Sequence, residues 1–137
     1  MTDLELMRLA EEARQFSYVP YSHFAVGAAL LTKDGKVYTG CNIENAAYSP
    51  TNCAERTAVF KAVSEGERDF DAIAVIAAPA GEKGRFCAPC GVCRQVLREF
   101  CEPATFRVLL GTTEEVQSFT LSELLPASFG PSDLRGE

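Results

Sequence analysis

The chain has 137 residues and a mass of 14.9 kDa, which suits one domain that buries roughly two-thirds of its unfolded surface. Hydrophobic residues make up 47% of the sequence and charged residues 23%, a balance that excludes disordered, collagen-like and coiled-coil chains. A net charge of −6 and a pI near 4.9 argue against nucleic acid or an anionic membrane as a partner.

The start of the chain carries neither a basic segment nor an apolar run. No stretch approaches the roughly 18 apolar residues that a membrane helix needs. We therefore expect a cytoplasmic protein. In that compartment, six cysteines are more typical of free thiols or metal ligands than of a disulfide framework.

The first elements predicted are a helix and a hairpin. Thr2 and Glu5 have the spacing of a capping box, and the apolar residues after them predict an amphipathic helix over 3–16. Apolar, aromatic and β-branched residues predict strands over 24–32 and 36–43, because the Lys-Asp-Gly sequence between them is typical of a tight turn.

The rest of the chain alternates helices and strands, followed by a polar tail that we expect to be loose. The order α-β-β-α-β-α-β predicts an α/β fold with a mixed sheet and helices on its faces, in a single domain over 1–137. The later elements are a helix from Asn52 that stops at Gly66, a buried strand over 72–78, a helix opened by Pro89 that ends before Pro103, a strand over 106–110, a short helix over 121–125 and the tail after Phe129.

Three cysteines lie where helices are predicted to begin: Cys53, Cys90 and Cys93. Unsatisfied N–H groups and the helix dipole lower a thiol pKa at such a place, and the thiolate is the form that binds a metal. Cys90 and Cys93 are three residues apart and can face one point, with Cys53 as a third ligand. Three protein ligands leave one tetrahedral position for water, the pattern of a catalytic zinc site.

Glu55 follows Cys53 by two residues, so a regular helix points the two side chains apart. Glu55 is therefore poorly placed as a ligand but well placed to approach a metal-bound water from the side. The alternative is that Glu55 belongs to a helix cap with Asn52 and that the thiols are simply buried.

Four segments of the chain form a distinctive set: FAVGAAL at 24–30, GCNIENA at 40–46, CAERTA at 53–58 and PCGVCRQ at 89–95. Together they resemble the cytidine deaminase family, in its small branch with three cysteine zinc ligands. The resemblance implies a three-layer sandwich with a mixed central sheet and helices on both faces. It also implies zinc-dependent hydrolytic deamination of cytidine and deoxycytidine, with Zn²⁺ held by Cys53, Cys90 and Cys93.

The resemblance also implies how the chemistry is divided. Glu55 would take a proton from the zinc-bound water and deliver protons to N3 of cytosine and to the departing ammonia. Three thiolates on one divalent ion leave a charge of −1, and Arg56, three residues after Cys53, is placed to donate hydrogen bonds to the sulfurs and offset it. The alternative for Arg56 is a solvated helix side chain.

Substrate contacts are implied in the same way. Phe24 would pack against the pyrimidine, the Ala54 backbone would help to hold the base, and Asn42 and Glu44 would bind the ribose hydroxyls. Without the resemblance, Phe24 would be a core aromatic, and Asn42 and Glu44 would lie on a solvated strand edge.

The small cytidine deaminases that this chain resembles are homotetramers in which adjacent subunits complete each active site. Tyr48 and Phe129 match the residues that a neighbouring subunit contributes. Ser128 stands where relatives usually place alanine. The alternative for Phe129 is that it anchors the C-terminal tail on its own subunit.

Cys87 supports competing interpretations. The spacing of Cys87, Cys90 and Cys93 is that of an iron–sulfur run, but Leu97 stands where the fourth cysteine belongs. A structural zinc site built from these three residues and Cys53 would be a scaffold with no open coordination position. A redox dithiol would leave the third thiol unexplained. Within the enzyme class, the alternative substrate is a related aminopyrimidine nucleoside such as an antibiotic.

Overall fold

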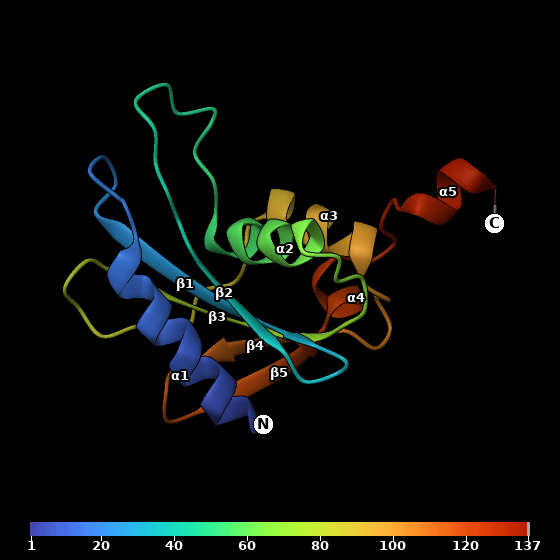
Figure 1. Ribbon diagram of the computed structural model, residues 1–137, viewed down its shortest axis with the longest axis horizontal. Helices are drawn as coiled ribbons and strands as arrows, with labels where there is room; N and C mark the ends of the chain where they lie inside the picture. The colour runs from blue at the N-terminus through green and yellow to red at the C-terminus, as the bar shows by residue number, and fades with distance from the viewer. Residues whose placement is uncertain (137) are drawn as a thin grey trace.

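The computed structural model describes residues 1–136, in which the strands form one mixed sheet in the order β2-β1-β3-β4-β5 (Figure 1). β3 and β4 are parallel, and the other neighbouring strands are antiparallel. The strands are β1 (Phe24–Thr32), β2 (Val37–Cys41), β3 (Phe70–Pro79), β4 (Arg107–Gly111) and β5 (Val116–Thr120).

Helices cover both faces of the sheet, as Figure 1 shows. One face carries α1 (Asp3–Ala13), which runs into a short 3₁₀ turn, η1 (Arg14–Phe16). The other face carries α2 (Ala54–Ser64), α3 (Gly91–Phe100) and the short α4 (Leu121–Leu124), and α5 (Pro131–Arg135) follows. Within residues 1–136, none of the helices has the length and apolar character needed to cross a bilayer.

Alternate residues of the strands supply two separate cores, because successive side chains of a strand point to opposite faces. In β3, Ile73 and Val75 pack with α2 and α3, whereas Ala72, Ala74 and Ile76 face α1. The result is the predicted α/β sandwich of three layers with a mixed central sheet.

Local sequence explains where several elements begin and end. Thr2 and Glu5 form the predicted capping box at the start of α1. After α2, Gly66 has a φ of +98°, and the N–H groups of Gly66 and Glu67 donate back to Val63 and Ala62. This is a Schellman termination, which favours glycine at the left-handed position.

Other boundaries differ from prediction. The helix expected over 3–16 ends at Ala13, and the tighter 3₁₀ turn leaves Phe16 73% exposed, outside the apolar stripe. The strand expected over 36–43 is limited to β2. The sequence did not predict β5, an edge strand whose exposure lacks alternation. The tail expected to be loose contains α5, begun by Pro131 and capped by Asp133, which accepts from the Gly130 N–H.

Candidate active site

The N-termini of α2 and α3 bring three thiols together. Cys53 and Cys90 are the residues at which these helices begin, and Cys93 lies in the first turn of α3. Their Sγ atoms all lie within 4.8 Å of one another. Among the described residues, Cys87 is not part of this group, so the geometry favours three ligands over the four-cysteine scaffold.

The cysteine cluster fits zinc. Tetrahedral coordination at about 2.3 Å per Zn–S bond requires sulfur atoms about 3.8 Å apart. The observed separations are 3.9 Å for Cys53 and Cys90 and 3.5 Å for Cys90 and Cys93. Neither Cys53 nor Cys90 makes a side-chain cap hydrogen bond to its helix, which leaves both sulfurs available to a metal.

Electrostatics favour a thiolate at Cys53. Hydrogen bonds from Cys93 and from Arg56 lower the pKa of Cys53 to about 5, and the Arg56 Nη2 atom lies 3.2 Å from its sulfur. The pKa of Cys93 is raised by its hydrogen bond to Cys53 and by burial, so the first proton leaves Cys53. Arg56 therefore lies against the Cys53 sulfur and is only partly exposed to solvent.

Glu55 is the buried carboxyl group of the site. Its side chain is 3% exposed, and its Oε1 atom finds no hydrogen-bond partner among residues 1–136. Burial raises its pKa to about 7. Asn52 does not cap with it, because the Asn52 amide donates to Thr57 at 3.1 Å. An unpartnered buried carboxyl group is costly and is typical of a functional site.

A cavity of about 210 Å³ opens beside Glu55 and the cysteine cluster. Its wall contains the predicted residues Phe24 and Asn42. A neighbouring hollow of about 380 Å³ contains Glu44 and Tyr48 and shares Thr51 with the first. Two further hollows, of about 350 and 460 Å³, contain none of these side chains.

Asn42 and Glu44 have partners within the chain that the sequence did not indicate. The Asn42 amide donates to the Phe24 carbonyl at 2.8 Å and accepts from the Val26 N–H at 2.9 Å. Glu44 accepts from the N–H groups of Tyr21 and Ser22 and from the Ser22 hydroxyl. The Ser22 contacts lower the pKa of Glu44. Each side chain thus also holds backbone at the rim of the site.

The remaining predicted residues lie at the border of the cavity or outside it. Ala54 is buried at the first position of α2. Tyr48 is 72% exposed, with its ring edge-on to Tyr21 at 6.0 Å. Phe129 is not among the residues that line the cavity and is 57% exposed, and its carbonyl accepts from the Gln95 amide at 2.9 Å.

Sequence reasoning missed part of the cavity wall. Val26, Val75 and Cys87 line the cavity with Phe24. Val26 was within reach of prediction, because it lies two residues after Phe24 and shares its face of the strand. Val75 was not, since only the pairing of β1 with β3 brings it there.

Comparisons with known proteins agree with this geometry. A profile described as "Cytidine and deoxycytidylate deaminase zinc-binding region" matches residues 1–109. The chain is 55% identical to a cytidine deaminase of Halalkalibacterium halodurans, with 94% of this chain and 95% of the relative covered. It is 51% identical to one of Sporosarcina psychrophila, with 95% and 93% covered.

A solved structure has the same fold. The crystal structure of a cytidine deaminase from Burkholderia pseudomallei superimposes with a TM-score of 0.85 at 48% identity, covering 94% of this chain and 100% of that one. The cysteine geometry, the profile, the relatives and the fold lead to one conclusion: this chain belongs to the cytidine and deoxycytidylate deaminase family, whose cofactor is zinc.

Proposed function

We propose that this chain hydrolyses cytidine and deoxycytidine to uridine and deoxyuridine with release of ammonia, as an enzyme of pyrimidine salvage. The observation that carries the proposal is Glu55, whose buried Oε1 atom is unpartnered among the described residues and which lines a mostly apolar cavity together with two members of the three-thiol cluster. This hydrolysis needs a group that carries protons, placed next to both the metal site and the pocket that binds the pyrimidine ring.

Cys53, Cys90 and Cys93 hold the zinc ion in this proposal. When bound, zinc supplies the Lewis acidity that makes water a nucleophile at neutral pH. Arg56 contributes a positive charge 3.2 Å from the Cys53 sulfur, which offsets the excess negative charge of three thiolates.

Glu55 moves the protons. Its pKa of about 7 lies close to neutral pH, where a carboxyl group works both as base and as acid. It accepts a proton from the attacking water, whose oxygen forms a bond to C4 of the pyrimidine. It passes that proton to N3. A second proton, from the new C4 hydroxyl, then moves through Glu55 to the amino group, so that the C4–N bond breaks, the C4 carbonyl forms and ammonia leaves.

The binding residues favour a nucleoside over a nucleotide. Phe24 and Val26 offer an apolar wall to the pyrimidine. Asn42 lines the same cavity, and Glu44 lines the neighbouring hollow. Within residues 1–136, no lysine or arginine lines either hollow. A phosphate group would meet the Glu44 carboxylate without a compensating cation, so deoxycytidylate is a poor substrate.

The site takes walls from a neighbouring subunit in this proposal. A cavity of about 210 Å³ is smaller than the roughly 300–1,000 Å³ of usual ligand pockets. Tyr48 and Phe129 are large, exposed aromatics suited to complete another subunit's site in a homotetramer.

A cytoplasmic location agrees with the free state of the cysteines.

A second candidate is deamination of a related aminopyrimidine nucleoside. The chain is 34% identical over 93% of its length to a Bacillus cereus protein named blasticidin-S deaminase. The higher identity of 51–55% to the relatives named cytidine deaminase favours cytidine.

The test measures ammonia release by the zinc-loaded protein from cytidine, deoxycytidine, deoxycytidylate and blasticidin S, with and without a strong zinc chelator. We expect release from the first two substrates only, and loss of activity after zinc removal. Absence of ammonia from every cytosine nucleoside would overturn the proposal.

The Glu55→Gln variant tests the proton carrier in the same assay. The amide keeps the shape of the side chain but neither accepts nor passes on a proton, so turnover falls by roughly 10²-fold to 10⁴-fold. Zinc content, measured by metal analysis, is expected to match the parent protein. Near-normal turnover in the zinc-loaded variant would assign proton transfer to another group.

A further inference from the structure

Arg14, at the end of α1, is a buried cation that the proposed chemistry does not use. Its side chain is 6% exposed. The guanidinium donates to the carbonyls of Ala25 at 2.9 Å, Ala78 at 3.1 Å and Glu82 at 3.1 Å, and to the Glu11 carboxylate. Arginine suits this role because its planar fork presents five N–H donors in fixed directions, which lysine cannot reproduce.

The carbonyls that Arg14 binds lie where β1 begins and β3 ends. Ala25 and Ala78 are direct partners in the ladder between these two strands, and Glu82 belongs to the loop that follows β3. One side chain therefore ties the last turn of the N-terminal helix to two central strands and a loop.

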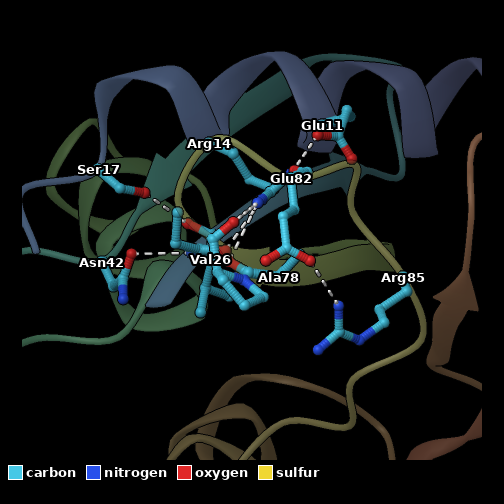
Figure 2. A network of polar contacts seen from close by, with 10 residues as sticks. Glu11, Arg14, Ser17, Val26, Asn42, Ala78, Glu82 and Arg85 are labelled. Carbon is cyan, nitrogen blue, oxygen red and sulfur yellow. Dashed lines mark hydrogen bonds and ion pairs between the residues drawn. The ribbon is translucent and has the colours of Figure 1, made fainter. Parts of the chain in front are cut away.

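The same stretch of β1 forms a wall of the candidate active site. Phe24 and Val26 line the cavity, on the face opposite to Ala25. Figure 2 shows Ser17 and Asn42 both directed at Val26, with Arg14 reaching toward Ala78 beside them. Asn42 and Ser17 hold the backbone of Phe24 and Val26, while Arg14 holds the carbonyl of the residue between them.

Close packing fixes the position from which Arg14 acts. A Cβ atom added at Gly27 would lie 2.0 Å from the Ala10 carbonyl and 2.8 Å from Arg14 Cγ. The end of α1 thus lies directly on the β1 backbone, with no room for a side chain between them. Because the contact between the end of α1 and β1 is close-packed, a shift of the Arg14 side chain also shifts the β1 backbone.

We propose that Arg14 is a positioning residue for the nucleoside pocket, acting through the backbone of residues 24–26 on the wall that receives the pyrimidine. This inference rests on the proposed function for its kinetic consequence. Its structural consequence, a fixed backbone at the start of β1, is independent of which substrate the protein uses.

The kinetic test compares Arg14→Met with Arg107→Met. Arg107 also ties α1 to the sheet, through ion pairs with Asp3 at 2.9 Å and Asp71 at 3.4 Å, but at the other end of the helix. We expect Arg14→Met to lower kcat/KM for cytidine by about tenfold to a hundredfold, mainly through KM, with zinc content unchanged. Arg107→Met is expected to leave both constants within about twofold.

Arg14→Lys keeps the positive charge but loses the several N–H donors of the planar guanidinium. Its KM is therefore expected to lie between those of the parent protein and Arg14→Met. It also replaces Arg14→Met in the comparison if the methionine variant does not fold. A parent-like KM in a folded, zinc-loaded variant, or an equal rise in KM for Arg107→Met, would overturn the proposal.

Hydrogen exchange separates this inference from the proposed function. The Val26 N–H donates to Asn42, so its exchange rate reports how firmly the start of β1 is held. We expect exchange at Val26 to rise about tenfold or more in Arg14→Met, while amides within α3 keep their parent rates. This result would support the positioning role even if cytidine were not the substrate. Unchanged exchange at Val26 would overturn the role even if cytidine were deaminated.

Discussion

A residue can be recognised as functional when its surroundings fail to satisfy it. Glu55 is buried with an unpartnered oxygen among the described residues, and the Sγ atoms of Cys53, Cys90 and Cys93 all lie within 4.8 Å of one another. Neither state stabilises the protein by itself, because a buried acid and a cluster of thiols are both costly without a ligand. Both states become favourable when a metal and a substrate occupy the site.

Arg56 leads to a prediction about pH. Its guanidinium helps to lower the pKa of Cys53, so Arg56→Ala raises that pKa, and a higher pH is then needed to form the thiolate that binds zinc. We expect roughly a 10-fold to 100-fold loss of zinc affinity, with zinc retention failing at a higher pH than in the parent protein.

The measurement is zinc retention against a chelator across a pH series. Arg68→Ala is the control, since Arg68 lies after α2 and donates to the backbone carbonyls of Val63 and Glu67, away from the cysteine cluster. If the retention curves of Arg56→Ala and the parent protein coincide, Arg56 does not stabilise the thiolates.

At the scale of elements, α3 holds the segment that carries Phe129. Arg98 donates to the Ser128 hydroxyl at 2.9 Å, and Gln95 donates to the Phe129 carbonyl at 2.9 Å. Ser128 therefore has a hydrogen-bond partner in α3. These two contacts fix the backbone on which Phe129 is carried.

The Arg98 and Ser128 pair can be tested by a double-mutant cycle. Arg98→Met and Ser128→Ala each remove the same hydrogen bond, which contributes about 0.5–1.5 kcal/mol. We expect each change to speed proteolysis within residues 125–130, and the double variant to add little to either single change. Fully additive effects in limited proteolysis would show that the two side chains act separately.

The elements themselves differ in how far local sequence defines them. The helices α1 and α2 carry their own stop and start signals, in Thr2, Glu5 and Gly66. The edge strand β5 carries no such signal, because its formation depends on pairing with β4 along residues 107–111. Edge strands with two partly solvated faces lack the alternation that identifies other strands.

At the scale of the whole molecule, the proposed tetramer has a direct test by subunit mixing. A Glu55→Gln subunit lacks the proton carrier but keeps Phe129, and a Phe129→Ala subunit has the opposite defect. If Phe129 completes a neighbour's site, co-expression of the two variants creates mixed tetramers that contain intact sites, and activity rises above that of either variant alone.

Separately tagged chains and tandem purification isolate the mixed assemblies, and sedimentation gives their mass. Each variant expressed alone, so that all its subunits carry the same defect, is the control. Activity of the mixed assemblies no higher than the mean of the two variants, or an active monomer, would contradict a site shared between subunits.

The sequence by itself determined the chemistry of this protein to a large extent. The metal and acid residues are encoded by local features: the spacing of Cys90 and Cys93, the start of a helix at Cys53, and Glu55 two residues later. Helix geometry alone fixes how the side chains of such residues are placed relative to one another. The structure brings the three sulfurs together and leaves Glu55 beside them. Hydrophobic periodicity likewise predicted the layered α/β fold, since it reflects which face of each element is buried.

Only the tertiary structure decided how the pocket is held. Arg14 and its acceptor Ala78 are 64 residues apart, and Asn42 meets Phe24 and Val26 only after β1 and β2 have paired. A helix or strand pattern describes the exposure of neighbouring residues and contains no information about distant acceptors. Buried donors must find such acceptors, and these contacts exist only once the sheet and the helix upon it have assembled.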